Sequence, residues 1–318
     1  MIADVFGPSP LAPLFRRPTN VVFVGTGGGN KGCLQGGHIE SVRWWLERRA
    51  MEPLTLKALV GNSIGAFNLS HWAYGMPPEV LGEWWHSVKR SSFGDYNLSL
   101  LIGFLRRKWR SHVLNPEPLA KYLDLFLPPK WDLLEVPLYV GVSCYSRSGR
   151  EMFGPGIDPS MPPLEAVITS MAVPGLYPQV KWRGAYWGDA ACMLNKIPIM
   201  DELCGPDTIT FVSILGYAGM SPVEDQAKFW PWEWSAEARE KISYEEYKQE
   251  IEGWGEFVSE NVRYCPRRGW LVIFHNQEGR KLSPRDFKSC GKLYDAGREK
   301  AWQVLIEFED CYRRAPMT

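Results

Sequence analysis

The sequence predicts an α/β fold with a mostly parallel central sheet, and three observations support this prediction. Short apolar runs rich in valine, leucine and phenylalanine recur along the chain, as buried parallel strands do. Two of these runs end in glycine-rich turns that lead into helix-compatible segments. Helical stretches separate the runs, as crossover connections between parallel strands require.

Five apolar runs are the candidate strands of this sheet. The first four alternate with helical stretches, and the fifth is expected to extend the same sheet. They are Val21 to Val24, Leu56 to Val60, Leu138 to Val142, Thr208 to Leu215 and Leu271 to Phe274.

Two long segments interrupt the alternation of strands and helices. Residues 78–127 are predicted to be a helical insertion, broken at Pro116 and Pro118, that roofs the active site. Residues 216–240 contain tryptophans at 230, 232 and 234 among polar neighbours. Such a segment suits a lid or a contact with the lipid–water interface, and packing over the core is the alternative.

The remaining chain shows no internal repeat and no domain boundary. Residues 1–19 are proline-rich, carry Asp4 and lack an apolar stretch of useful length, so they are expected to form a flexible N-terminal arm rather than a secretory signal. Residues 20–318 are then expected to form a single catalytic domain.

Composition narrows the class of protein. The 318 residues are 45% hydrophobic, so the chain can bury a substantial core. The 36 basic side chains balance the 36 acidic ones, so the net charge does not indicate a nucleic-acid-binding protein. Seven dispersed cysteines without a Cys-x-x-Cys pair indicate a reducing compartment and neither a disulfide framework nor a metal site. No apolar run is long enough to span a membrane. We therefore expect a cytoplasmic protein without a cofactor, whose membrane contact is peripheral.

Residues 58–66 carry the most informative motif of the chain. An apolar strand runs into Gly61-Asn-Ser63-Ile-Gly65, the pattern of a nucleophile elbow with Ser63 at its apex. Glycine is needed on both sides because a Cβ at Gly61 or Gly65 would collide with the neighbouring backbone. The bend also places Ser63 at a helix N-terminus, which favours developing negative charge. An ordinary strand-to-helix turn with a capping serine is the alternative.

A second glycine turn precedes the elbow, in the order strand, Gly27-Gly28-Gly29, Lys31 and helix. Successive backbone N–H groups beside a lysine make a donor surface for an anion, either a phosphate or an oxyanion. A dinucleotide site is disfavoured because the second strand ends in the serine elbow instead of an acidic residue, and a Walker loop is excluded because Gly32 follows Lys31. The favoured interpretation is an oxyanion hole for attack by Ser63.

The base that would activate Ser63 is less obvious from the residues. Among the five histidines, His38, His71, His86 and His112 lie in helical stretches and are expected to be packing or surface residues. His275 ends a late strand, where an α/β-hydrolase keeps its base, and is the serious histidine candidate. Asp189 is another candidate, because it follows the short strand Ala185 to Trp187 among small residues that allow close approach.

Four blocks in this order resemble the patatin-like family of lipid acyl hydrolases. They are the glycine loop from Gly27 to Gly32, the elbow from Gly61 to Gly65, the segment from Thr169 to Pro178 and the motif from Asp189 to Ala191. Residues 283–305 are similar to the closing helix of the family. The sequence differs from the family pattern in having Lys31 in place of arginine and Ala190 in place of glycine.

The resemblance implies a three-layer α/β/α fold and a phospholipase that degrades membrane lipids. Ser63 would be the nucleophile and Asp189 the base of a catalytic dyad without histidine, and the Gly27 to Gly29 amides with Lys31 would form the oxyanion hole. Aspartate is a weak base at neutral pH, so we expect Trp182 to Trp187 to bury Asp189. The resemblance also suggests that members are silent until an activator binds, and a homo-oligomer is the other candidate partner.

Three hypotheses follow from the sequence. The first is a patatin-like serine hydrolase of phospholipid or related ester bonds, with transient contact to a membrane surface. The second is an esterase that uses His275 as its base. The third is a catalytically silent lipid-binding protein that keeps the fold.

Overall fold

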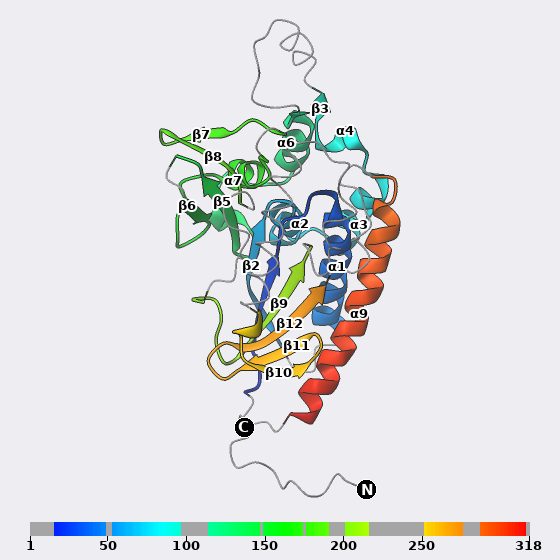
Figure 1. Cartoon of the computed structure of the whole chain (residues 1–318). Coiled ribbons are helices and arrows are strands. Elements are labelled where there is room, and N and C mark those ends of the chain that lie inside the picture. Colours follow the sequence, from blue (N-terminus) through cyan, green and yellow to red (C-terminus); the bar gives the residue numbers. More distant parts are fainter. Residues whose placement is uncertain are drawn as a thin grey trace, which may run out of the picture.

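The centre of the protein is a ten-stranded mixed sheet (Figure 1). The structure is a computed structural model that describes residues 16–48, 53–96, 114–146, 149–173, 176–190, 201–215, 251–275 and 287–315. The strand order is β10-β11-β12-β9-β1-β2-β5-β8-β7, and β6 pairs with β5 outside this path.

Five neighbouring strands form the parallel middle of the sheet and confirm the five predicted strands. All four pairings among them are parallel. In spatial order they are β12 (Gly269–His275), β9 (Thr208–Ile214), β1 (Asn20–Gly25), β2 (Thr55–Asn62) and β5 (Leu138–Cys144). Every residue of β9 is buried, because both faces of the sheet are covered at its centre.

Antiparallel strands extend the sheet at both edges. Strands β10 and β11 continue it beyond β12, and β6 continues it beyond β5. Strand β8 pairs with the end of β5 on the edge that β2 also uses, and β7 pairs with β8. Their bounds are Glu256–Ser259 for β10, Val262–Cys265 for β11, Gly149–Phe153 for β6, Ala185–Asp189 for β8 and Val180–Trp182 for β7. A separate pair joins β3 (Asp95–Tyr96) to β4 (Leu114–Asn115).

Helices cover one face of this sheet. An apolar cluster joins α1, α2, α7 and α9 to that face, and α9 runs beside α1 along its length (Figure 1). The helices are α1 (Gly32–Arg48), α2 (Ile64–Ala73), α3 (Pro78–Ser87), α4 (Arg90–Phe93), α6 (Glu117–Asp124), α7 (Pro163–Ser170) and α9 (Cys290–Arg314). Short 3-10 turns lie at Gly29–Lys31 and Trp131–Leu133.

The opposite face of the sheet buries a second apolar cluster. Valines of β1, β2 and β9 and Ile273 of β12 pack there against Leu203 and Trp254. The predicted mixed α/β fold with a mostly parallel sheet flanked by helices is thus confirmed. The described residues do not test the second helical layer of the predicted three-layer arrangement.

The described part of the predicted insertion, residues 78–127, is mostly helical, with α3, α4 and α6 around the short β3–β4 pair. Pro116 and Pro118 mark the beginning of α6, where proline costs no hydrogen bond. Residues 97–113 of the insertion and the predicted lid at 216–240 lie outside the described residues.

The described residues of the predicted N-terminal arm, 16–19, form hydrogen bonds with the domain. The Arg16 amide donates a hydrogen bond to the Tyr264 hydroxyl at 3.1 Å, and the Thr19 hydroxyl donates to the Asp207 carboxylate at 2.9 Å. Residues 1–15 lie outside the described part of the chain. None of the helices described is long and apolar enough to cross a membrane.

Candidate active site

Ser63 sits at a sharp bend between β2 and α2. Its backbone adopts φ 51° and ψ −126°, and only one other described non-glycine residue, Arg183, has a positive φ. Such a conformation is strained for a serine and recurs at functional sites. The residue is buried, with 7% of its surface exposed. The predicted elbow therefore has the strained backbone expected of a nucleophile.

The two glycines that flank Ser63 are required by the packing, as the sequence predicts. A Cβ on Gly61 would lie 2.5 Å from the Cα of Ala66 on the first turn of α2. A Cβ on Gly65 would collide with the carbonyl oxygen of Gly25 at the end of β1. The contact at Gly65 also brings the elbow against the strand that leads into the glycine loop.

The glycine loop lies at the same edge of the sheet as the elbow. Gly25 pairs with Gly61 across β1 and β2, so both connections leave the carboxyl ends of adjacent parallel strands. Gly29 has φ 60°, and a Cβ on Gly28 would lie 2.5 Å from the Cβ of Leu215. Lys31 is half-buried and ends the 3-10 turn of the loop. The structure thus brings Gly27 to Lys31 next to the elbow.

A buried polar network holds this loop in place. The Leu215 amide donates to the Thr26 hydroxyl at 2.9 Å, which ties the start of the loop to the end of β9. On the other side, the Asn68 amide group donates to the Gly32 carbonyl at 2.8 Å and to Gln35 at 3.0 Å. Trp85 of α3 in turn donates to Asn68 at 3.0 Å. Sequence reasoning missed these residues, whose only signal is a polar side chain within an otherwise apolar helix or strand end.

Asp189 ends β8 and lies level with Ser63. Asn62 of β2 pairs with Gly141 of β5, and the next residue of β5, Val142, pairs with Asp189 of β8. Strand β6 pairs with β5 from Val140 to Cys144 and so takes one edge of it, which leaves β2 and β8 on the other edge. Ser63 directly follows Asn62, so Ser63 and Asp189 lie on the same edge of β5, at neighbouring positions along it. Strand β8 thus continues along β5 where β2 ends, and no strand separates Ser63 from Asp189.

Asp189 is buried, and its backbone is held on both sides. Only 1% of its surface is exposed, which agrees with the predicted burial. Trp187 of the predicted aromatic segment is buried on the same strand, whereas Tyr186 is 49% exposed. The Asp189 amide donates to the Ala172 carbonyl at 3.1 Å, and the Ser143 hydroxyl donates to the Ala190 carbonyl at 3.2 Å.

The alanine at position 190 fits its site without backbone strain. Ser63 and Arg183 are the only non-glycine residues with positive φ in the described ranges, so Ala190 does not occupy the left-handed region that favours glycine. Its side chain is fully buried. The departure from the glycine of the family pattern is therefore compatible with the position of Asp189.

The described histidines make their contacts elsewhere. His38 Nδ1 lies 2.8 Å from the Ser213 hydroxyl, and burial together with the nearby His275 lowers the pKa of His38 to about 3. Burial lowers the pKa of His71 to about 4. His86 lies near Asp295 on the surface, with 3.4 Å between Nε2 and Oδ1. His112 lies outside the described residues.

The strand order separates His275 from Ser63. Strands β9 and β1 lie between β12, which ends at His275, and β2. Three strand intervals correspond to roughly 14 Å between backbones, more than the side chains of a histidine and a serine can span.

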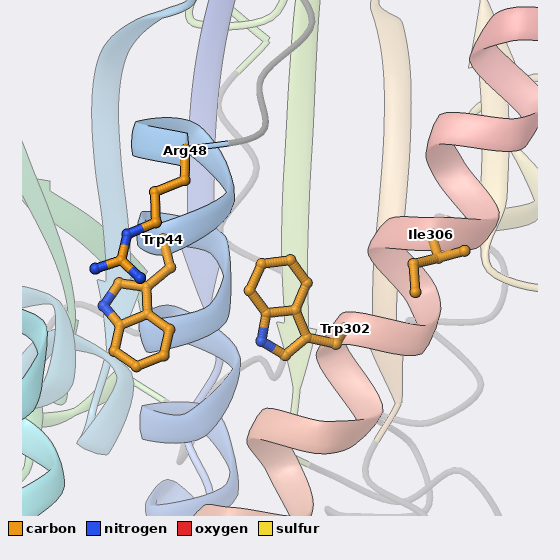
Figure 2. Close-up of a pocket in the computed structure, with 4 residues that line it drawn as sticks. All are labelled: Trp44, Arg48, Trp302 and Ile306. Carbon is orange, nitrogen blue, oxygen red and sulfur yellow. The ribbon is translucent and has the colours of Figure 1, made fainter.

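The described residues also form an apolar groove on the outer surface of the helical layer (Figure 2). Trp44 and Arg48 at the end of α1 line it together with Trp302 and Ile306 of α9. Trp45, the neighbour of Trp44, is buried, so only one ring of that pair enters the core. Ser63 and Asp189 are not among its lining residues.

Comparison with known proteins identifies the family. The sequence model of the patatin-like phospholipase family matches residues 24–203, which is more than half of the chain and includes the glycine loop, the elbow and Asp189. The chain belongs to the patatin-like phospholipase family. Comparison with curated protein sequences returned no match.

Similar solved structures come from two bacteria. VipD from Legionella pneumophila is 16% identical, with a TM-score of 0.45, over 93% of this chain and 67% of VipD. ExoU in the heterodimeric ExoU–SpcU complex from the type III secretion system of Pseudomonas aeruginosa is 12% identical, with a TM-score of 0.32, over 79% of this chain. That match spans 60% of the ExoU chain in the heterodimeric complex. In the structure of full-length ExoU with full-length SpcU, the match spans 53% of the ExoU chain.

Proposed function

We propose that the protein is a serine acyl hydrolase that cleaves ester bonds of phospholipids or related lipids, as a phospholipase A or lysophospholipase does. Membership in the patatin-like phospholipase family supports a lipid hydrolase. One observation carries the finer proposal. The strained Ser63 and the buried Asp189 lie at neighbouring positions on the same edge of β5, beside a glycine loop.

In the proposed mechanism, Asp189 accepts the proton of Ser63 while the serine oxygen attacks the ester carbonyl. Burial favours this transfer, because a carboxylate removed from water is costly to keep charged. The alcohol leaves as it takes the proton back from Asp189, and an acyl-serine remains. A water molecule then gives a proton to Asp189 and attacks the acyl-serine, and Ser63 Oγ takes that proton back from Asp189 as the fatty acid is released, which restores the dyad.

The oxyanion formed in each attack needs hydrogen-bond donors. We assign this role to the backbone N–H groups of Gly27, Gly28 and Gly29, with the charge of Lys31 beside them. Gly29 is exposed, and Gly27 and Gly28 are half-buried, so the loop is accessible to a ligand. A single donor of this kind is commonly worth about 2.7–4 kcal/mol in the transition state.

The Ser-His alternative is less well supported, because two strands separate β12 and its His275 from β2. His275 also lies near His38, whose pKa it helps to lower, rather than beside the elbow. We therefore propose a dyad without histidine. The proposed substrate resides in bilayers, so catalysis would take place during transient contact with a membrane surface.

The first test is labelling by a fluorophosphonate probe, measured by intact mass. Wild type, Ser63→Ala, Asp189→Asn and His275→Ala are treated in parallel, and hydrolysis of phospholipid vesicles and of a lysophospholipid is measured for each. We expect Ser63→Ala and Asp189→Asn to lose both signals by 100-fold or more, and His275→Ala to retain them.

Other outcomes separate the remaining hypotheses. Loss of labelling in His275→Ala but not in Asp189→Asn would establish the Ser-His esterase. A folded wild type that neither labels nor hydrolyses but binds vesicles would support the silent lipid-binding protein and contradict our proposal.

A further inference from the structure

We propose that Ser170 is a positioning residue that holds the nucleophile in its strained conformation and, through the turn that follows it, sets the position of Ser63 relative to Asp189. This inference rests on the proposed function, since it concerns the same site. Ser170 lies within the segment from Thr169 to Pro178 that carries part of the family resemblance, but the sequence assigns no role to its hydroxyl.

The hydroxyl of Ser170 joins the elbow to the neighbouring strand. The Ser63 amide donates a hydrogen bond to Ser170 Oγ at 2.7 Å, and Ser170 Oγ donates in turn to the Gly141 carbonyl of β5 at 2.6 Å. Ser170 is fully buried, so water does not compete for these bonds. Consecutive hydrogen bonds of this kind polarise and strengthen one another in a low-dielectric interior.

The Ser63 amide has a particular need for this partner. The ladder between β2 and β5 ends at the pair of Asn62 and Gly141, and Ser63 is the N-cap of α2, where amides lack intrahelical acceptors. Its φ of 51° must also be maintained by the surroundings. Ser170 supplies an acceptor at the point where the chain leaves the sheet.

The same turn also holds the proposed base. Helix α7 ends at Ser170, and two residues later the Ala172 carbonyl accepts the Asp189 amide at 3.1 Å. A three-residue turn thus contacts Ser63 at one end and Asp189 at the other. Removal of the Ser170 hydroxyl releases only the Ser63 end, so it alters the geometry of the dyad without removing a reacting group.

Ser170→Ala tests this role, and Ser170→Cys is the conservative variant of nearly the same size, with a weak donor and acceptor. The matched control is Ser70→Ala in α2, because Ser70 is also fully buried and donates to a backbone carbonyl, that of Phe67, at 2.7 Å. Wild type and Ser63→Ala complete the set. Thermal unfolding establishes that each variant is folded at the assay temperature.

Two measurements are made on each variant. The first is amide hydrogen exchange of the peptide that contains Ser63, which requires no activity. The second is the kinetics of ester hydrolysis, separated into kcat and KM. We expect Ser170→Ala to speed exchange at the elbow at least 10-fold and to lower kcat by roughly 10- to 100-fold with KM within about twofold, because misplacement of a reacting group by 1 Å can cost about 100-fold.

We expect Ser170→Cys to give intermediate values and Ser70→Ala to match wild type in both measurements. Unchanged exchange at the elbow in a folded Ser170→Ala variant would overturn the inference whether or not the protein is active. So would a wild-type kcat in that variant when hydrolysis depends on Ser63. Hydrolysis that persists in Ser63→Ala would instead contradict the proposed function, and the exchange measurement would still decide the role of Ser170.

Discussion

At the scale of single residues, the candidate site depends on positions where only one kind of side chain fits. Gly61 and Gly65 leave no room for a Cβ, and Ser63 takes a backbone conformation that serines rarely adopt. Ser170 and Asp189 are polar, yet at most 1% exposed. Such positions are costly to change, because the surrounding backbone cannot shift without loss of the packing on either side.

The buried histidines make stability dependent on pH. His71 Nδ1 donates to the Phe67 carbonyl at 3.0 Å, and its Nε2 accepts from the Tyr122 hydroxyl at 2.9 Å. Burial lowers its pKa from 6.5 to about 4, so below pH 6.5 the unfolded chain binds a proton that the folded protein does not. We expect the free energy of unfolding to fall between pH 6.5 and 4, and His71 to contribute up to about 1.4 kcal/mol per pH unit.

The check is urea unfolding from pH 7 to pH 4. The variant His71→Gln offers an amide donor and a carbonyl acceptor without a titrating ring, so its acid destabilisation should be smaller than that of wild type. His86→Gln is the control, because His86 is 48% exposed and its replacement should leave the pH dependence in place. Equal pH slopes for wild type and His71→Gln would contradict the prediction.

At the scale of elements, helices α1 and α9 approach each other closely. Gly37 of α1 lies against the backbone of Tyr294 and Arg298, and Gly297 of α9 lies against the backbone of Leu34. The Ser41 hydroxyl donates to the Arg298 carbonyl at 2.9 Å across the same interface. Cys290 at the beginning of α9 contacts the Asn30 carbonyl of the glycine loop, so this helix pair also supports the site.

Gly297→Ala gives opposite expectations for an isolated helix and for this interface. Alanine is about 1 kcal/mol more favourable than glycine within a helix, but here its Cβ would meet the Leu34 carbonyl. We expect a net destabilisation of roughly 1–3 kcal/mol, as for other overpacked positions. Chemical unfolding measures it, with exposed Glu299→Ala of the same helix as the control. A stabilised variant would show that the helices separate without cost.

At the scale of the whole molecule, the folded unit extends well beyond the family match. That match ends at residue 203, yet β9 and β12 lie in the parallel middle of the sheet and α9 covers its face. Phe308 of α9 packs edge-on against Trp45, Phe211 and Trp270, whose ring centres lie 5.6–6.3 Å away. The two parts of the chain therefore share one core.

Removal of α9 should therefore prevent folding. Burial of a large apolar side chain is worth about 1.5–3 kcal/mol, and α9 buries several, against a total stability of about 5–15 kcal/mol for a typical protein. The buried residues of α9 include Tyr294, Val304, Leu305, Phe308 and Tyr312. We expect a chain that ends at residue 289 to lose its cooperative unfolding transition and to bind a hydrophobic dye.

A chain that ends at residue 315, just beyond α9, is the control and should unfold like wild type. Calorimetry and dye fluorescence measure both truncations. A cooperative transition in the shorter chain would mean that the sheet folds without this helix.

The sequence by itself determined the local parts of this protein. The five parallel strands, the short strand that begins at Ala185 and the elbow were predicted from the residues, because apolar runs and glycine spacing act over a few residues. The steric need for Gly61 and Gly65 was predictable for the same reason. These features depend on the chemistry of neighbours in the chain. The closing helix was predicted from the resemblance to the family.

Only the tertiary structure decided which distant residues lie together. The pairing of strands places Asp189 on the edge of β5 that β2 also uses, next to the end of β2, and His275 two strands beyond β1, and no local pattern specifies that pairing. It also brings the Ser170 hydroxyl, 107 residues away in the chain, to the Ser63 amide. The physical reason is that strand pairing and helix packing optimise burial over the whole chain, so the partners of a polar side chain are set by residues far from it in sequence.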